Sequence, residues 1–391
     1  MQTNHIKVPL GLPETTVIRQ EISPGGALRV VVRRTTEQER CPRCGHVATK
    51  RHDVRQRAKA DVPIGDHAVT LVVLRRRFRC FTCRRPFSEP EPICGPRRRL
   101  TCRLRERLGQ ECRDRPVEHL AQEFGVSPTT VRRARREVVA RQQEQAGSAP
   151  PILGIDEFSV RKGQRYATGL HDITGRRVLD VIKGRTQEKV QEALERLSPP
   201  ERVRVVSMDL AGNFRAAVQE VLPDALIVAD KFHVVKRVNK AVWQVWRRLL
   251  RGTPKDDPLR TDGALALRAY EQLAAPQRAS LDVLLRAYPL LQRAHRLKED
   301  FRHWYRRCSA KDARLELSAW RRMVTDLPDL PEFAALAGMF EGWQEEILNY
   351  FTHPVTQGFV EGKNNLAKAL ERRAFGYRNV DNLRDQLLLA N

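Results

Sequence analysis

Three acidic residues have the types and positions that metal-dependent phosphodiester chemistry requires. Asp156 lies in a predicted strand, and Asp209 directly follows another predicted strand. Carboxylates on neighbouring strands can share hard divalent cations, which prefer oxygen ligands. Two Mg²⁺ ions about 4 Å apart would activate a nucleophilic oxygen and stabilise the leaving one. Such a site usually needs a third carboxylate, and Glu361 is the candidate late in the chain.

Glu361 belongs to a predicted helix that is rich in amides and bases. Asn364, Asn365 and Lys368 follow it at three- and four-residue spacings, which bring side chains together on a helix. If this helix packs on the sheet, it delivers Glu361 to the two aspartates, with these three residues as active-site neighbours. Glu157 follows Asp156 directly, but successive side chains of a strand point to opposite faces, so we expect Glu157 outside the site.

The elements that must position these residues alternate between strands and helices. The predicted order is three strands, a helix, a strand, a helix, a strand and a helix. That order is typical of an RNase H-like α/β fold, in which the strand before Asp209 lies next to the strand of Asp156. The predicted strands span 151–158, 165–173, 177–182, 203–208 and 225–229, and the helices span 187–197, 213–221 and 232–250.

Residues 236–350 follow a helical pattern throughout, which predicts an all-helical insertion. It would split the RNase H-like catalytic core into a first part, 142–235, and a second part, 351–391, that carries the third carboxylate. We expect the tryptophans of the insertion in its core rather than at a nucleic-acid surface. They are Trp243, Trp246, Trp304, Trp320 and Trp343.

Seven of the eight cysteines fall in the first 112 residues, and four of them form two CxxC pairs. Cys41 with Cys44, and Cys80 with Cys83, can place four thiolates around one structural Zn²⁺, which leaves no open position for catalysis. Residues 1–92 are therefore predicted to form a zinc ribbon with a hairpin inserted between the pairs. The alternatives are two unrelated turns or a disulfide pair. His46 and His52 are expected to be solvated or core histidines, and the unpaired Cys94, Cys102, Cys112 and Cys308 to be buried thiols.

The charge is strongly basic, with 71 Lys and Arg against 47 Asp and Glu, a net charge of +24. This excess favours a polyanionic partner, by default nucleic acid, over a basic protein with scattered surface charge. Residues 1–150 hold 31 basic and 16 acidic residues, whereas the longer remainder holds 40 and 31. Three arginine runs near the second CxxC pair are expected to contact phosphate. They are Arg75, Arg76, Arg77, Arg84, Arg85, Arg97, Arg98 and Arg99.

Residues 93–141 are predicted to hold a helix-turn-helix. Gly125 stands where the turn needs a positive φ, and Ser127 with Pro128 is a good helix start. The second helix would enter the major groove of DNA, with Arg132 and Arg133 foremost. A plain pair of helices with a basic face is the alternative. The side chains expected to be exposed on the second helix are Thr129, Thr130, Arg132, Arg133, Arg135 and Arg136.

Several classes of protein are excluded by what the sequence lacks. No apolar stretch is long enough to span a membrane. Residues 1–7 contain no apolar core of a secretion signal, so we expect a cytoplasmic and not a secreted protein.

Taken together, these motifs resemble the DDE transposases of the ISL3 insertion-sequence family. The resemblance covers nearly the whole chain, including the CxxC pairs and the helix-turn-helix. It implies bacterial DNA transposition by a nucleoid-associated protein, with Asp156, Asp209 and Glu361 as the metal-binding triad. Asp230 and His233 match the family's D-x-F-H motif and are expected beside the active site or on DNA. The motifs that carry the resemblance span 154–159, 165–168, 206–209, 229–234 and 358–365.

The resemblance also implies a reaction and partners. Two Mg²⁺ ions, for which Mn²⁺ can substitute, would support hydrolysis at the element ends, and the exposed 3′-OH groups would attack target DNA. Residues 1–140 would bind the terminal inverted repeats of the insertion sequence, which are double-stranded DNA. The whole protein would act on DNA as a homodimer or higher homo-oligomer. Two alternatives stay open: a catalytically inactive zinc and helix-turn-helix transcriptional regulator, and an RNase H-like nuclease that cleaves without joining.

Overall fold

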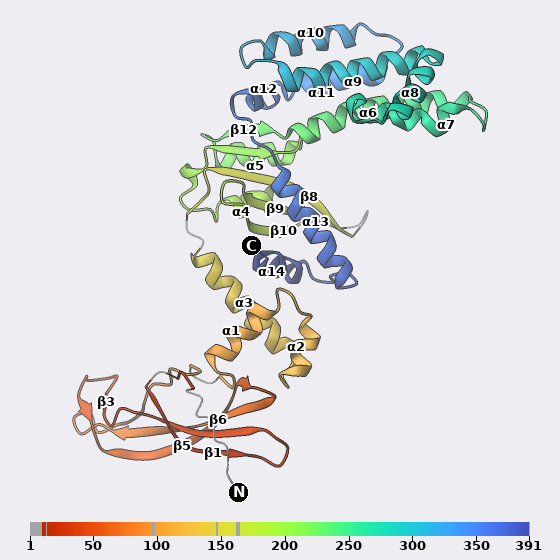
Figure 1. Ribbon diagram of the computed structural model, residues 1–391. Coiled ribbons are helices and arrows are strands. Elements are labelled where there is room, and N and C mark those ends of the chain that lie inside the picture. Colours follow the sequence, from red (N-terminus) through yellow and green to blue (C-terminus); the bar gives the residue numbers. More distant parts are fainter. Residues whose placement is uncertain (1–9, 13, 96–97, 146–147, 162–164, 391) are drawn as a thin grey trace. The chain divides into compact units, whose positions relative to one another are not determined.

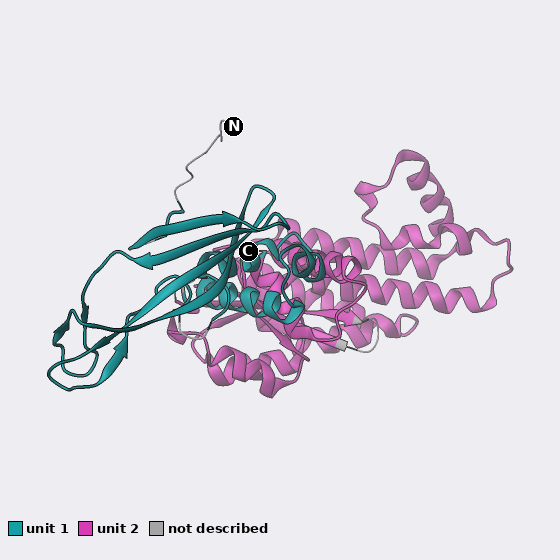
Figure 2. Ribbon diagram, turned by 90° about the horizontal axis from the view of Figure 1, so that it is seen from below, with its two compact units in different colours: residues 1–145, 390 teal, residues 146–389, 391 magenta. Residues whose placement is uncertain are grey.

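The computed structural model describes residues 10–390, apart from residue 13 and the segments 96–97, 146–147 and 162–164 (Figure 1). The chain forms two compact units, which comprise residues 1–145 and residues 146–389 (Figure 2). Each unit has a hydrophobic core of its own. The boundary falls within residues 141–151, whose polar, small and proline residues are typical of a linker, while the finer division into five domains stays a prediction.

The first unit is built on a sheet in the strand order β1-β2-β6-β5, with β7 paired to β6. β2 and β6 run parallel, and the other pairs are antiparallel. Val30 pairs with Leu71 and Val32 with Val73, so alternate apolar residues of the two central strands supply the core. The strands span Thr15–Ile22 (β1), Leu28–Arg34 (β2), Glu39–Arg40 (β3), Val47–Ala48 (β4), Arg51–Ile64 (β5), His67–Arg79 (β6) and Pro86–Ser88 (β7).

Three helices follow the sheet and form the predicted helix-turn-helix. Gly125 takes a φ of +60°, and the Ser127 hydroxyl accepts a hydrogen bond from the Thr130 N–H at 3.2 Å. Gly109 permits a close helix crossing, because a Cβ there would lie 2.4 Å from Cγ2 of Val138. The helices span Cys102–Glu111 (α1), Val117–Glu123 (α2) and Pro128–Gln145 (α3).

The second unit contains a five-stranded sheet in the order β10-β9-β8-β11-β12. β8, β9 and β10 form an antiparallel meander, and β11 and β12 continue from β8 in parallel. All five strands lie where the sequence predicts them, with ends shifted by three residues or fewer. They span Ile152–Arg161 (β8), Arg165–Asp172 (β9), Arg177–Lys183 (β10), Val205–Met208 (β11) and Leu226–Ala229 (β12).

The two faces of β8 have different neighbours. Leu153 and Ile155 belong to the main core, which also contains buried residues of α4 and α5. A Cβ on Gly154, on the opposite face, would lie 3.1 Å from Cγ2 of Val360 in α13. Asp156 shares that face with Gly154 and is therefore turned toward α13. The helices span Gln187–Leu194 (α4), Gly212–Val221 (α5), Gly358–Arg373 (α13) and Val380–Leu389 (α14).

Between β12 and α13 the chain folds into helices, with no strand in this part of the described structure. Phe301 is central to their packing, with ring centroids 4.9 Å from Trp320 and 5.3 Å from Phe340. The helices span Lys231–Leu249 (α6), Pro258–Asp262 (α7), Ala275–Ala287 (α8), Pro289–Arg307 (α9), Ala313–Thr325 (α10), Pro331–Glu341 (α11) and Gln344–Thr352 (α12). Short 3-10 turns in the same part span Leu250–Gly252 (η2), Gly263–Leu267 (η3) and Tyr270–Gln272 (η4), and another, Pro200–Arg202 (η1), precedes β11.

The tryptophans of these helices do not all serve the core. Trp304, Trp320 and Trp343 are buried, as predicted, and Trp246 is partly buried. Trp243 is 40% exposed, so the prediction is wrong for this residue. The reason is its phase on α6, whose buried face consists of Val234, Val238, Ala241, Val242 and Val245.

Candidate active site and zinc centre

Four cysteine sulfurs meet in the first unit. Cys41 and Cys44 lie in the turn between β3 and β4, and Cys80 and Cys83 in the turn between β6 and β7. The Sγ atoms of Cys41 and Cys83 are 3.6 Å apart, those of Cys44 and Cys80 are 3.5 Å apart, and all four lie within 4.8 Å of one another. Tetrahedral zinc with Zn–S bonds of about 2.3 Å requires sulfurs about 3.8 Å apart, so the cluster fits Zn²⁺.

The local backbone favours the thiolate forms of Cys41 and Cys80. At Cys44, the hydrogen bond from the His46 backbone is outweighed by the neighbouring thiols, Cys80 foremost, which raise its pKa to about 11. The backbone N–H of Cys83 lowers the pKa of the Cys80 thiol to about 6. A lower pKa favours the deprotonated ligand that zinc binds. The long β5–β6 hairpin fills the interval between the two pairs, as the sequence predicts. His46 and His52 are exposed and are not part of the four-cysteine cluster.

The remaining cysteines divide into two kinds. Cys94 and Cys112 are buried, and burial raises the pKa of their thiols to about 12 and about 11. The prediction of buried thiols is wrong for Cys102, which is exposed, and for Cys308, which is half-buried. Cys102 begins α1 and lies off the face that buries Leu104 and Leu108, and Cys308 caps the carboxyl end of α9.

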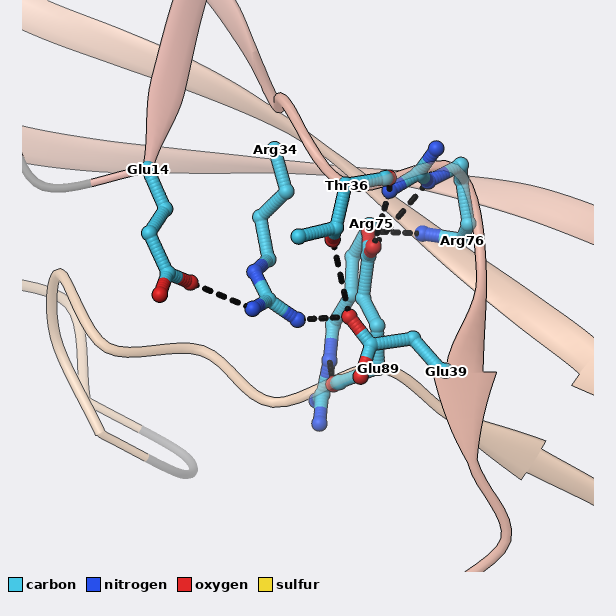
Figure 3. A network of polar contacts seen from close by, with 7 residues as sticks. All are labelled: Glu14, Arg34, Thr36, Glu39, Arg75, Arg76 and Glu89. Carbon is cyan, nitrogen blue, oxygen red and sulfur yellow. Dashed lines mark hydrogen bonds and ion pairs between the residues drawn. The ribbon is translucent and has the colours of Figure 1, made fainter. Parts of the chain in front are cut away.

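The first arginine run is largely committed to ion pairs within the protein (Figure 3). The Arg76 guanidinium is buried, and its Nε and Nη2 lie 3.0 and 2.8 Å from Oε2 of Glu89. Arg75 donates through Nε to the Glu89 carbonyl, and Arg77 pairs with Asp53 at 2.8 Å. Arg76 is therefore a structural residue, which corrects the expectation that it contacts phosphate.

In the other two runs, the arginines that the structure describes, which are also predicted to contact phosphate, are more exposed than Arg76. Arg84 and Arg85 are exposed beside Cys83, and Arg99 is exposed before α1. Arg98 forms an ion pair with Glu137 at 2.9 Å. Arg97 lies outside the described residues.

On α3, the predicted recognition helix, most of the expected side chains reach the surface. Thr129, Arg133 and Arg136 are exposed, while Thr130 is half-buried and shares a hydrogen bond with the Ser127 hydroxyl. Arg132 is also half-buried and pairs with Glu118 at 2.7 Å. Arg135 is only 2% exposed, so its predicted exposure is wrong. It directly follows buried Ala134 and lies one turn before buried Val138 and Val139, on the inner face of the helix.

Three aspartates form a row across the second unit's sheet. Ile155 of β8 pairs with Met208 of β11, which also pairs with Ala229 of β12. The residue that follows each of these three in the chain is an aspartate: Asp156 within β8, Asp209 directly after β11 and Asp230 directly after β12. Adjacent strands are about 4.8 Å apart, so parallel register places the three aspartates in neighbouring positions along one edge of the sheet. Among the described residues, the four cysteines alone form a group whose ligand atoms all lie within 4.8 Å of one another.

His233 connects this row of carboxylates. Its Nδ1 lies 2.9 Å from Oδ2 of Asp209, and its Nε2 lies 4.0 Å from Oδ2 of Asp230. It reaches them because α6 begins directly after Asp230, which places His233 in the first helical turn. Asp230 and His233 therefore lie beside the other aspartates, as the sequence resemblance implies.

Burial and the neighbouring charges together determine the pKa of each group in this row. Burial raises the pKa of Asp156 to about 6 and also raises the pKa of Asp230. For Asp209, burial works in the same direction, but the hydrogen bond and charge of His233 lower its pKa overall. Burial opposes a charge on His233, yet the facing carboxylates, with Asp209 foremost, raise its pKa. The carboxylates of this row thus favour the charged form of His233.

Helix α13 supplies the remaining groups from the other side. Asn364 is buried, and its Nδ2 donates a hydrogen bond to Oδ2 of Asp156 at 2.6 Å. Glu361 lies one turn earlier and lines a cavity of about 570 Å³ together with Asp156, Asp230 and His233. Asp209 and His233 line an adjoining groove of about 510 Å³. Glu361 and the three aspartates therefore border two adjoining cavities that share His233.

Two of the predicted active-site neighbours on α13 do not reach these cavities. Asn365 and Lys368 are exposed on α13 and do not line either cavity. Glu157 pairs with Arg185 at 3.1 Å, while Asp156 bonds Asn364, which agrees with their expected positions on opposite faces of β8.

Sequence reasoning missed the pair that fixes the start of α13. The buried Gln357 donates through Nε2 to the Ser207 hydroxyl of β11 at 3.0 Å. The Glu361 N–H in turn donates to the Gln357 carbonyl at 2.9 Å. The pair thus ties the turn that carries Glu361 to the strand that precedes Asp209. Its only signal in the sequence is a serine within an otherwise apolar strand.

Among the described residues, no helix combines the length and the apolar character that a membrane crossing requires.

Comparison with known proteins agrees with this architecture. Residues 153–387 match a family model described as "Transposase", residues 37–83 match the "zinc-finger of transposase IS204/IS1001/IS1096/IS1165", and residues 92–139 match the "Helix-turn-helix domain of transposase family ISL3".

Curated relatives extend the similarity along the chain. The chain is 30% identical over 369 residues to the transposase for insertion sequence element IS1001 of Bordetella parapertussis, covering 92% of this chain and 90% of the relative. It is 28% identical over 254 residues to the transposase for insertion sequence element IS1557 of Mycobacterium tuberculosis, covering 58% and 57%. A zinc ribbon, a DNA-binding helix-turn-helix and a DDE transposase domain thus succeed one another along the sequence, and the chain belongs to the ISL3 family of transposases.

Proposed function

We propose that the second unit is an RNase H-like catalytic domain in which Asp156, Asp209 and Glu361 form the catalytic triad. The observation that carries this proposal is the register of β8 and β11, which puts Asp156 and Asp209 side by side. Glu361 faces the same cavity as Asp156 from α13. In this proposal, the helices α6 to α12 are an insertion between the sheet and the helix that delivers the third carboxylate.

The carboxylates also suit the metal that this chemistry needs. All candidate ligands are oxygen donors, the type that Mg²⁺ and Mn²⁺ prefer. Asp156, Asp209 and Glu361 would hold two Mg²⁺ ions, which when bound would activate the attacking oxygen and stabilise the leaving oxygen. Asn364 orients Asp156 through its hydrogen bond, and the pair of Gln357 with Ser207 holds the helix turn that carries Glu361.

The proposed reaction has two phosphoryl-transfer steps. In the first, water attacks a phosphorus at the element end, a new P–O bond forms, and the P–O3′ bond breaks to leave a 3′-OH. In the second, that 3′ oxygen attacks a phosphorus of target DNA and displaces another 3′ oxygen, which leaves as a hydroxyl. Neither step requires an external energy source. The first replaces a phosphoester bond with a P–O bond from water, and the second replaces one phosphoester bond with another.

The first unit would select the DNA on which this chemistry occurs. We propose that α3 enters the major groove of the terminal inverted repeats, with Thr129, Arg132, Arg133 and Arg136 facing the DNA. Arg84 and Arg85 are exposed beside the zinc cluster and suit phosphate contacts. Joining two element ends calls for a homodimer or larger assembly, acting on DNA in the bacterial cytoplasm.

The triad is tested by strand cleavage on a duplex that carries the terminal repeat flanking this coding sequence. Asp156→Ala, Asp209→Ala and Glu361→Ala should each abolish detectable cleavage with Mg²⁺, while binding of the repeat persists. The matched control is Glu157→Ala, which removes the adjacent carboxylate from the opposite face of β8 and should leave cleavage intact. Retained cleavage in any of the three variants would remove that residue from the triad.

The same substrates separate the proposed function from the two alternatives. A transposase joins the cleaved 3′ end to a second duplex, a nuclease stops at cleavage, and an inactive regulator binds without cutting. Binding by residues 1–140 with no preference for the repeat over unrelated DNA, in a salt-controlled assay, would contradict the proposed division of labour.

A further inference from the structure

Helix α6 exposes a face whose composition sets it apart from the packed helices around it. Its sequence from Lys231 to Leu249 contains no acidic residue. Five of its side chains follow one another at spacings of four, four, three and four residues, which places them on a single face. We call this set the α6 stripe; it consists of Phe232, Lys236, Lys240, Trp243 and Arg247.

The aromatic members of the stripe lie at the surface. Phe232 is 55% exposed and Trp243 is 40% exposed. The core of this region is already complete on the opposite face of α6, where five buried aliphatic residues pack toward α9 and α11. Large aromatic side chains left at a surface commonly mark an interaction site.

The cations of the stripe are also available for a partner. Among the described residues, no acidic side chain forms an ion pair with Lys236, Lys240, Arg247 or the neighbouring Arg237. By contrast, Arg248 on another side of the same helix pairs with Glu332 at 2.8 Å. The guanidinium of Arg247 lies 5.7 Å from the ring centroid of Trp243, so base and aromatic ring form one combined surface.

The stripe begins at the candidate active site. Lys236, Lys240 and Trp243 line the same groove as Asp209 and His233, with a volume of about 510 Å³. Figure 1 shows α6 starting at the end of β12 and running away from the sheet. Eleven residues separate Lys236 from Arg247, which corresponds to about 16 Å of helix. That length matches about five base pairs at 3.4 Å each.

We propose that the α6 stripe binds the backbone of the duplex that flanks the scissile phosphate. This inference rests on the proposed catalytic site, because it uses the groove at Asp209 as the position of that phosphate. Lys236, Lys240 and Arg247 contact successive phosphates, while Phe232 and Trp243 pack against deoxyribose or against a base unstacked at the cut. In this proposal the first unit recognises the sequence of the repeat, and α6 of the second unit binds the DNA backbone.

The test neutralises the stripe in the full-length chain. The probe is a duplex that carries the terminal repeat and its flanking DNA, and each chain also carries Asp209→Asn so that binding is measured without cleavage. The triple variant exchanges three stripe cations for glutamine. Its control makes the same charge change at exposed cations elsewhere in the helical segment. The two sets are K236Q, K240Q and R247Q, and R286Q, R307Q and K311Q.

Two readouts are expected to change only in the stripe variant. The slope of log affinity against log salt concentration should fall by about 2.7, because each lost phosphate contact removes about 0.9. Hydroxyl-radical protection should disappear from about five base pairs beside the cleavage position, while protection over the repeat remains. Trp243→Ala should weaken binding about fivefold or more, and Trp243→Phe should retain most of the affinity. Circular dichroism of each variant verifies that it is folded.

If the stripe variant keeps the slope and the footprint of its control, the inference is wrong. That result would leave the triad untouched, since the triad is tested by cleavage. Conversely, loss of the footprint together with continued cleavage by Asp156→Ala would overturn the proposed triad and not the stripe. The two proposals therefore fail separately.

Discussion

Individual residues of similar type serve different purposes in this protein, and burial separates them. Arg76 and Arg84 both belong to arginine runs next to the second CxxC pair. Arg76 points into the protein and pairs with Glu89, whereas Arg84 is exposed in the zinc-binding turn. A buried charge needs its partner, because an uncompensated carboxylate in a low-dielectric environment is costly.

This difference predicts opposite phenotypes for two arginine substitutions. Arg76→Ala leaves Glu89 buried without its cation and should lower the free energy of unfolding of the first unit by about 3–5 kcal/mol. Arg84→Ala removes an exposed side chain and should change that free energy by less than about 0.5 kcal/mol. Urea denaturation of the two zinc-loaded variants makes the comparison. Equal stability would mean that the Arg76–Glu89 pair is not a structural element.

The hydrogen bond from Asn364 to Asp156 makes a second prediction at this scale. Asn364→Leu removes the donor and frees Asp156 to rotate, so the cleavage rate should fall about tenfold to a hundredfold, as is typical when a partner of a metal ligand is lost. Asn365→Leu changes the next residue, which is exposed, and should leave the rate unchanged. Restored cleavage at higher Mg²⁺ concentration would support a positioning role, whereas an unchanged rate in Asn364→Leu would contradict it.

At the scale of elements, the sequence predicted the sheet well, because strands with regular apolar patterns leave few arrangements. Strands β11 and β12 and the aspartates that follow them could be read from Val203–Met208 and Ala225–Ala229 alone. The orientation of α13 could not, because its inner face includes the polar Asn364, whose place depends on a partner 208 residues away. The exposure of Trp243 escaped prediction for a different reason: the residue type suggested the core, whereas its phase relative to the buried valines of α6 places it on the outer face.

The zinc ribbon is the element whose stability depends most directly on a ligand. Its knuckles β3–β4 and β6–β7 are short, so the four thiolates contribute much of what holds them together. We predict one zinc per chain by elemental analysis, and its loss in Cys80→Ser. A strong chelator should lower the melting temperature of the first unit and abolish binding of the repeat. Cys308→Ser, a half-buried cysteine outside the cluster, should retain the zinc; loss of zinc there instead would contradict the assignment.

Across the whole molecule, basic residues outnumber acidic residues, but several acidic residues lie at the candidate active site. The chain carries +24 overall, yet Asp156, Asp209, Asp230 and Glu361 border adjoining cavities in its second unit. Without metal, these carboxylates repel the phosphate that must approach them. If the proposed triad holds Mg²⁺, DNA binding by the second unit should therefore depend on that ion.

This argument predicts that Mg²⁺ strengthens DNA binding through the triad and not only through chemistry. On a duplex without the repeat, at constant ionic strength, the affinity of the wild-type chain should rise when Mg²⁺ replaces a chelator. Neutralising the site in the double variant Asp156→Asn with Asp209→Asn should remove that rise and tighten binding in chelator, on the order of fivefold, which corresponds to about 1 kcal/mol.

Mg²⁺ also competes for phosphates, but it does so equally for both chains, so the informative quantity is the ratio of their affinities. That ratio should favour the variant in chelator and approach unity in Mg²⁺. A ratio that stays constant would show that the carboxylates do not face DNA phosphate, and would contradict their placement at the reacting bond. Because the zinc ribbon and helix-turn-helix are unchanged between the two chains, any change in the ratio must arise in the second unit.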